Sequence, residues 1–246
     1  WTGPLALVRG ISRGRLGAKA LLRLPERFGY LPAIVAFLGF AWFELVDLAP
    51  SDPTRLAVAV SAYWAATLLA MIAFGEQAWR ARGEPFSIFF RLIGGMSPLA
   101  WRASTAPGGG WRRVQVSLRW PGWTLLENQP LPPSGILFVL LTLASVSFDG
   151  FSKTFTWLTL IGINPLEFPG RSAVQYTNTA GLLAAFALLS GGFYAVVFLG
   201  SALIGKTEHV ARAAGLLVYS VVPIAIAFHA AHYMTNFLVD AQFALV

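Results

Sequence analysis

The chain contains no cysteine among its 246 residues. This absence excludes a disulfide framework, a cysteine-ligated zinc or iron–sulfur site and a thiol nucleophile. Charge is scarce as well, because 12% of the residues are charged while 56% are hydrophobic, with a mean hydropathy of +0.63. Soluble domains carry roughly 25% charged residues. The composition therefore excludes a soluble globular domain.

Acidic residues are the rarer of the two charged classes. Eleven Asp and Glu stand against eighteen Lys and Arg, which gives a net charge of +7 and a sequence pI near 10.2. In a soluble chain this excess would suggest a nucleic-acid partner. In an apolar chain it is typical of cytoplasmic loops between membrane spans, so no nucleic acid is expected.

Five apolar runs are long enough to cross a bilayer core about 30 Å thick, which takes about 20 residues of helix. They predict an all-α fold, a polytopic integral membrane helical bundle formed by residues 1–246 as a single membrane domain. The predicted spans cover residues 30–48, 56–78, 134–151, 179–204 and 213–239.

The basic residues are distributed unevenly between these spans. Fifteen of the eighteen Lys and Arg lie in residues 1–29, in residues 79–133 and in the connection between the fourth and fifth spans. Cytoplasmic loops collect such residues. The pattern predicts a cytoplasmic N-terminal segment, a cytoplasmic loop at 79–133 and a C-terminal end outside.

The long cytoplasmic loop contains a short apolar segment, FSIFFRLIGGMSPLA at 86–100. Gly94, Gly95 and Pro98 interrupt it, so it predicts an interfacial helix or a re-entrant segment rather than a span. Residues 107–129 mix Trp with Arg, which favours contact with anionic lipid headgroups. The glycine triplet at 108–110 lacks a following Gly-Lys-Ser/Thr and is not a phosphate loop.

The fifth span carries a stripe of polar residues. His229, His232, Tyr233, Asn236 and Asp240 recur at intervals that place them along one face of a helix. Polar and ionisable residues inside a membrane are costly and usually face the interior of a bundle. The stripe is therefore the leading candidate for a functional site.

Other spans bring polar residues to the same predicted level, the outer half of the bilayer. The first span ends with Glu44 and Asp47, and the third ends with Asp149. Further polar residues at this level are Ser147, Lys153, Gln175, Tyr176 and Asn178. Four spans thus converge on a polar, outward-facing cavity.

This set of residues permits a metal site. Two imidazoles at positions i and i+3 can hold one Zn, Fe or Cu ion when a carboxylate completes the set. The predicted metal ligands are His229, His232 and Asp149, with Glu44 as the other carboxylate that can serve as third ligand. Such an ion lowers the pKa of bound water and makes a hydrolytic nucleophile, with a carboxylate as base.

Two other interpretations use the same residues without a bound metal. Both histidines can be neutral and hydrogen-bonded within the bundle, while Asp149 pairs with Lys153 at the membrane interface. Alternatively, the His, Asp and Glu side chains can form a proton or ion path.

Four segments resemble a bacterial family of multi-pass membrane proteins labelled fenitrothion hydrolase. They are LPERFGYLPAIVAFLGFAWFELV (24–46), AFGEQAWRARGEPFSIFFRL (73–92), SVSFDGF (145–151) and VPIAIAFHAAHY (222–233). The elements SFDG and AxHxAHY are the most specific parts. The resemblance implies a bacterial inner (plasma) membrane protein, phosphotriester hydrolysis, and functional positions at Asp149, His229, His232 and Tyr233. It also implies spans before Trp1 and a tail after Val246.

Three classes of function follow from these observations. The chain can be a metal-assisted hydrolase of amphiphilic esters, in which His229, His232 and Asp149 hold the ion and Glu44 is the general base. It can be a transporter or handling protein for an ion or metal. It can also be an accessory subunit of a larger membrane complex, with other membrane subunits and the lipid bilayer as its partners.

Overall fold

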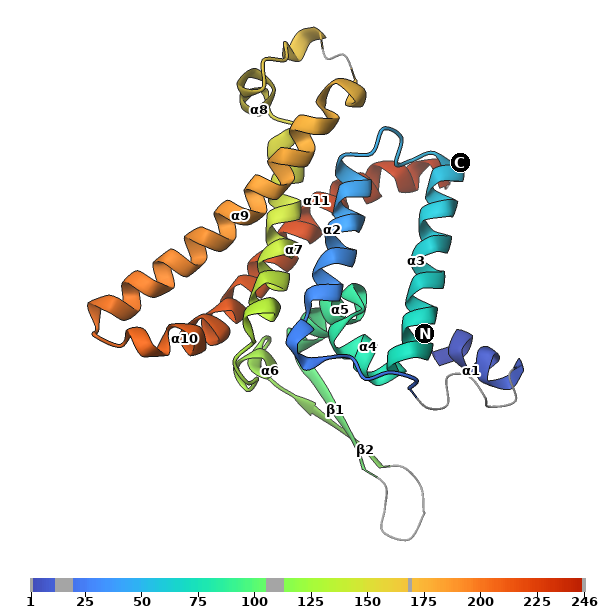
Figure 1. Cartoon of the computed structure of the whole chain (residues 1–246), viewed down its shortest axis with the longest axis vertical. Helices are drawn as coiled ribbons and strands as arrows, with labels where there is room; N and C mark the ends of the chain where they lie inside the picture. Colours follow the sequence, from blue (N-terminus) through green and yellow to red (C-terminus); the bar gives the residue numbers. More distant parts are fainter. Residues whose placement is uncertain (1, 12–19, 105–112, 168–169, 245–246) are drawn as a thin grey trace.

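The computed structural model describes residues 2–11, 20–104, 113–167 and 170–244. Most of them form helices, with one pair of strands (Figure 1). In chain order the elements are α1 (Thr2–Ile11), η1 (Glu26–Phe28), α2 (Leu31–Leu45), α3 (Pro53–Phe74), α4 (Glu76–Arg82), α5 (Pro85–Gly95), β1 (Leu99–Ser104), β2 (Arg113–Leu118), α6 (Trp123–Leu126), α7 (Pro133–Ser152), α8 (Phe155–Leu160), η2 (Pro165–Glu167), α9 (Arg171–Leu203), η3 (Thr207–His209), α10 (Val210–Leu217), η4 (Val218–Ser220) and α11 (Val221–Ala244).

Within the described residues, four helical segments are long and apolar enough to cross a membrane. They are α3, α7, α9 and the segment Thr207–Val239, which runs through α10 into α11. These segments match four of the five predicted spans. They define a multi-pass helical membrane protein.

The first predicted span is shorter than expected. Residues 30–48 were expected to cross, but the helix there, α2, has 15 residues. It begins at Leu31, with Pro32 in its first turn, and Val46 forms its C-cap. Asp47 follows directly and bonds the backbone N–H of Ala49 at 3.0 Å, which starts the loop in place of another helical turn.

Helix α7 is the centre of the bundle. About 67% of its most apolar 18-residue stretch is buried, against 11% of the corresponding stretch in α3. Phe138 and Leu141 on α7 pack against Ala33 and Phe37 of α2, while other α7 residues form a second cluster with α9, α10 and η4. Helix α3 presents most of its apolar surface outward, as expected for a helix in contact with lipid.

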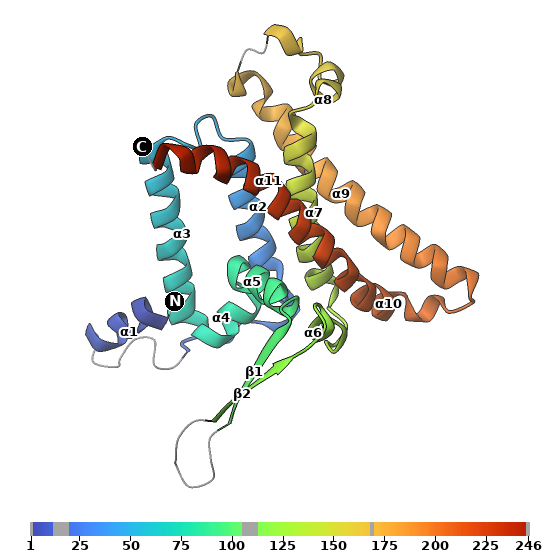
Figure 2. The ribbon, with the colours of Figure 1, turned by 180° about the vertical axis from the view of Figure 1, so that it is seen from behind.

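The long helices alternate in direction, so the ends of α2 and α7, which carry Glu44 and Asp149, meet on one face. Helices α2, α7 and α11 run toward the face that carries α8, and α3 and α9 run back (Figure 1). Viewed from behind, α11 crosses α7 and α2 (Figure 2). This arrangement brings the ends of α2 and α7 and the polar stripe of α11 close to one another.

The predicted all-α fold is confirmed in its helices, and one short β-hairpin adds to it. Strands β1 and β2 form an antiparallel pair in register from Leu99↔Leu118 to Ser104↔Arg113. The segment RVQVSL alternates polar and apolar residues, and LAWRAS does so from Trp101 onward, which is the period of a strand rather than of a helix. The apolar segment predicted at 86–100 is a helix only as far as Gly95, where α5 ends. The glycine triplet at 108–110 lies outside the described residues.

Candidate functional site

Asp149 is the most central ionisable residue at the face where α2, α7 and α11 meet. It lies in the last turn of α7, and its side chain is 6% exposed. Its Oδ2 atom contacts the Nε2 atom of His232 on α11. Its Oδ1 atom lies 2.7 Å from the Nζ atom of Lys153, one turn further along. A buried carboxylate therefore has a partner at each oxygen, as burial of a charge requires.

The contact with Asp149 identifies the basic nitrogen of His232. An ionised carboxylate only accepts hydrogen bonds, so the Nε2 atom of His232 carries the proton that faces Asp149. In the neutral ring, Nδ1 is then the nitrogen with the free lone pair. The carboxylate thus orients an imidazole for acid–base chemistry.

A second polar pair lies next to the first. The hydroxyl of Tyr233 donates to Oε1 of Glu44 at 2.6 Å, which joins α11 to the end of α2. The rings of His232 and Tyr233 are nearly perpendicular, with centroids 5.2 Å apart. Both predicted carboxylates, Glu44 and Asp149, therefore contact the polar stripe of α11.

His229 lies at the edge of this cluster, where its ring stacks on that of Tyr233 with centroids 6.1 Å apart. Its Nδ1 atom lies 2.8 Å from the backbone oxygen of Ala225, and its ring lies against Phe89 with centroids 5.3 Å apart. Because a carbonyl oxygen only accepts, Nδ1 is the protonated nitrogen and Nε2 is the free one. The helical spacing correctly predicted a shared face, and both histidine rings contact Tyr233, but it is His232 that contacts the Asp149 carboxylate.

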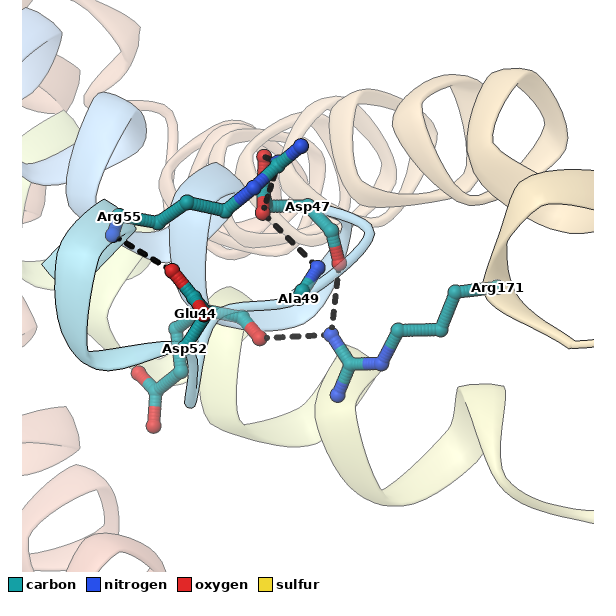
Figure 3. A network of polar contacts seen from close by, with 6 residues as sticks. All are labelled: Glu44, Asp47, Ala49, Asp52, Arg55 and Arg171. Carbon is teal, nitrogen blue, oxygen red and sulfur yellow. Dashed lines mark hydrogen bonds and ion pairs between the residues drawn. The ribbon is translucent and has the colours of Figure 1, made fainter.

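The loop after α2 forms the rim of the site (Figure 3). Arg171, at the start of α9, donates to the backbone oxygens of Glu44 at 3.2 Å and Asp47 at 3.0 Å. These carbonyls lie at the end of α2, where a helix leaves its oxygens without intrahelical partners. The Asp47 carboxylate pairs with Arg55 of α3 at 3.0 Å. Asp47 therefore organises the loop, whereas Glu44 belongs to the polar cluster.

The cluster borders a cavity of about 360 Å³. Its lining residues are Phe40, Phe43, Glu44, Leu45, Pro50, Ser51, Leu56, Asp149, Lys153, Arg171 and His232. A larger cavity of about 740 Å³ lies near the opposite end of α7 and includes Arg82 and Arg91 in its wall. The smaller cavity is the better site because an imidazole, two carboxylates and two cations line it together.

Other predicted residues lie away from the cavity. Tyr176 is 87% exposed, and Asn178 accepts a hydrogen bond from the Trp157 indole at 2.8 Å. The side chains of Asn236 and Asp240 lie outside the described residues. Arg171 is a site residue that we did not predict, although it is one of only three basic residues in the segments predicted to lie outside.

The predicted metal site is not assembled in the described part of the chain, which holds no group of three His, Asp or Glu side chains placed to bind one ion. Both oxygens of Asp149 already have partners, and His229 bonds to the backbone. A bound Zn, Fe or Cu ion stays a prediction.

Comparison of the chain with protein-family models, with curated proteins and with solved structures finds no match. The fold and site define a class, a multi-pass helical membrane protein with a buried acid–base cluster beside a cavity.

Proposed function

We propose that this protein is a membrane-embedded hydrolase of amphiphilic esters, with Asp149 and His232 as its acid–base pair. The observation that carries the proposal is the contact between the buried Asp149 carboxylate and the His232 imidazole at the wall of the 360 Å³ cavity. A carboxylate that fixes the tautomer of a histidine is the arrangement by which hydrolases activate a nucleophile. The resemblance to the fenitrothion hydrolase family supports phosphotriesters as substrates.

The proposed reaction uses water as the nucleophile. The Nδ1 atom of His232 takes a proton from water, and the resulting hydroxide attacks the phosphorus or carbonyl carbon of the ester. A new oxygen bond forms there while the bond to the leaving alkoxide or phenolate breaks. The imidazolium, stabilised by Asp149, then returns its proton to the leaving group. Lys153 and Arg171 place positive charge at the cavity, where negative charge develops on the reacting oxygens.

Glu44, which we expected as the general base, is held in place by Tyr233. Its Oε1 atom accepts the Tyr233 hydroxyl at 2.6 Å, beside the His232 ring. The single hydroxyl proton of Tyr233 is used in this bond, so we place Tyr233 as the group that positions the Glu44 carboxylate in the wall of the cavity.

The site opens on the outer face of a bacterial plasma membrane in this proposal. Residues 1–29 and 79–133 are cytoplasmic, and the C-terminal end is outside. This orientation follows the basic residues, fifteen of which lie in the alternate segments. Esters that partition into the outer leaflet then reach the cavity from the lipid side.

Replacement of His232 tests the proposed chemistry. In proteoliposomes supplied with a 4-nitrophenyl phosphotriester, we expect His232→Gln to lower kcat by roughly 10²–10⁴-fold, the usual contribution of an acid–base group. His209→Gln is the matched control, because His209 lies in the exposed turn η3 beside Glu208. Release of 4-nitrophenolate is followed by absorbance. Turnover that survives His232→Gln would refute the proposed site.

Metal handling is a second candidate function, favoured by one observation. The bond from His229 Nδ1 to the Ala225 carbonyl at 2.8 Å leaves Nε2 free, the state in which histidines bind metals. His229, His232 and Asp149 would be the ligands after side-chain rearrangement.

Metal analysis separates this candidate from the first. If the three residues hold an ion, purified wild-type protein contains one equivalent of Zn, Fe or Cu by mass spectrometry, and His229→Ala and His232→Ala both lose it. His209→Ala is the control that retains it. An ion content that is the same in all four proteins would exclude this ligand set.

A further inference from the structure

A groove between α2 and α3 extends the polar cavity into the apolar part of the protein. It has a volume of about 380 Å³, and its wall is almost entirely apolar. Three residues line both spaces: Phe40, Phe43 and Leu56. The polar cavity and the apolar groove are therefore adjacent, so that one elongated molecule can reach both.

Small side chains leave this groove open. Ala36 and Gly39 of α2 face Ala59 of α3 across it, and the ring of Phe86 from α5 closes one side. A Cβ atom added at Gly39 would meet no atom within 4 Å. The space at Gly39 is thus unoccupied by the protein itself, and it lies between two helices made almost wholly of apolar residues.

The two spaces differ sharply in chemistry. The groove offers carbon surface from Phe40, Val60 and their neighbours, whereas the cavity offers Arg171, Lys153 and His232. Arg171 donates to backbone carbonyls, and no carboxylate pairs with it among the described ion pairs, so its charge is available to an oxygen-rich group. An occupant that satisfies both parts has a hydrocarbon chain joined to a polar ester or phosphoester end.

We propose that the α2–α3 groove binds the hydrocarbon chain of a single-chain amphiphile whose ester or phosphoester end lies in the polar cavity. This inference rests on the proposed function for the identity of the reacting end, and it adds the element that selects the substrate. The combined volume lies within the range of about 300–1,000 Å³ that is common for small-molecule sites.

Photolabelling in nanodiscs tests the groove without requiring turnover. The probe is dimethyl dodecylphosphonate with a diazirine at the end of its chain, whose phosphorus–carbon bond keeps head and chain together. Mass spectrometry is expected to locate the label on α2 and α3 near Gly39 and Ala59. Unlabelled dimethyl dodecylphosphonate is expected to compete, and inorganic phosphate is not.

Gly39→Leu is the perturbation of the groove, because an added Cβ atom there meets no atom within 4 Å and the side chain beyond it would occupy groove space. We expect it to reduce groove labelling about tenfold, the effect of losing contact with two or three methylene groups. Gly191→Leu, at a glycine of α9 that also has no neighbour within 4 Å of an added Cβ, is expected to label as wild type.

The outcomes separate this inference from the proposed function. Groove labelling that Gly39→Leu abolishes, in a protein without esterase or phosphotriesterase turnover, supports the binding site and refutes the hydrolase. Turnover that is unaffected by Gly39→Leu, with label spread over the outer faces of α9 and α11, refutes the groove and leaves the hydrolase. A crosslink between two chains at Gly39 also refutes it, because a protein segment would then fill the groove.

Discussion

Asp149 illustrates how the protein accommodates a charge inside an apolar bundle. Its carboxylate is 6% exposed and touches one histidine and one lysine. The two partners differ in their environments, since His232 is 22% exposed and Lys153 is 60% exposed. The contact with His232 is therefore the less hydrated of the two, and its hydrogen bond is the stronger for that reason.

This difference predicts unequal effects of two substitutions. Asp149→Asn keeps the size of the side chain but cannot satisfy both partners as an acceptor, and we expect it to destabilise the protein by about 1–3 kcal/mol. Lys153→Ala removes only an exposed partner and is expected to cost about 1 kcal/mol or less. Thermal unfolding in detergent, followed by circular dichroism, measures both. A larger loss for Lys153→Ala would contradict this account.

The residue types and their helical spacing predicted much of the cluster. Glu44, Asp149, His232 and Tyr233 were expected near one another, and the structure joins them in two pairs. Spacing alone could not predict that His229 bonds to Ala225, because a helical register fixes the face of a residue but not its rotamer.

At the scale of helices, the packing of α7 against α9 depends on a glycine. A Cβ atom at Gly181 of α9 would lie 2.6 Å from ring atoms of both Phe148 and Trp157. The Trp157 ring meets the Phe148 ring edge-on, with centroids 5.4 Å apart. The absence of a side chain at Gly181 thus allows α9 to approach these two aromatic rings.

We expect Gly181→Ala to destabilise the protein by about 1–3 kcal/mol through overpacking. Gly191→Ala in the same helix adds a methyl group to open space and is expected to be neutral or stabilising, because alanine favours helix more than glycine does. Thermal unfolding of the two variants in the same detergent provides the comparison. Equal stabilities would show that Phe148 and Trp157 move aside without cost.

Hydropathy predicted the long helices well because a membrane span needs a continuous apolar run. It failed for β1 and β2, because these six-residue strands are too short to give a clear hydropathy signal. It also overestimated the span at 30–48, since the apolar run continues beyond the last turn of α2. The end of that helix depends on Asp47 and on Arg171, which is distant in sequence.

At the scale of the whole molecule, three basic residues stand apart from the other fifteen by their place in the chain. The three basic residues in the segments predicted to lie outside all contact one region: Arg55 on Asp47, Lys153 on Asp149, and Arg171 on the carbonyls of α2. The positive-inside pattern predicts few cations in such segments. These three each hold a group at the end of α2 or α7.

The lack of cysteine makes the topology directly testable. Single substitutions Ser51→Cys, in the loop after α2, and Ser117→Cys, in β2, introduce the only thiol of each variant. We expect an impermeant maleimide to label Ser51→Cys in intact cells and Ser117→Cys only after permeabilisation. The reverse pattern would place the acid–base cluster on the cytoplasmic side.

The length of α2 has a consequence for the membrane around it. Its 15 residues extend about 22 Å, less than the roughly 30 Å of a bilayer core. By contrast, the 33 residues of α9 extend about 50 Å, which exceeds the bilayer core. We expect lipids beside α2 to thin to match it, which would lower the water surface toward Glu44 and the cavity. A mismatch in helix length would then be the route by which water reaches the proposed site.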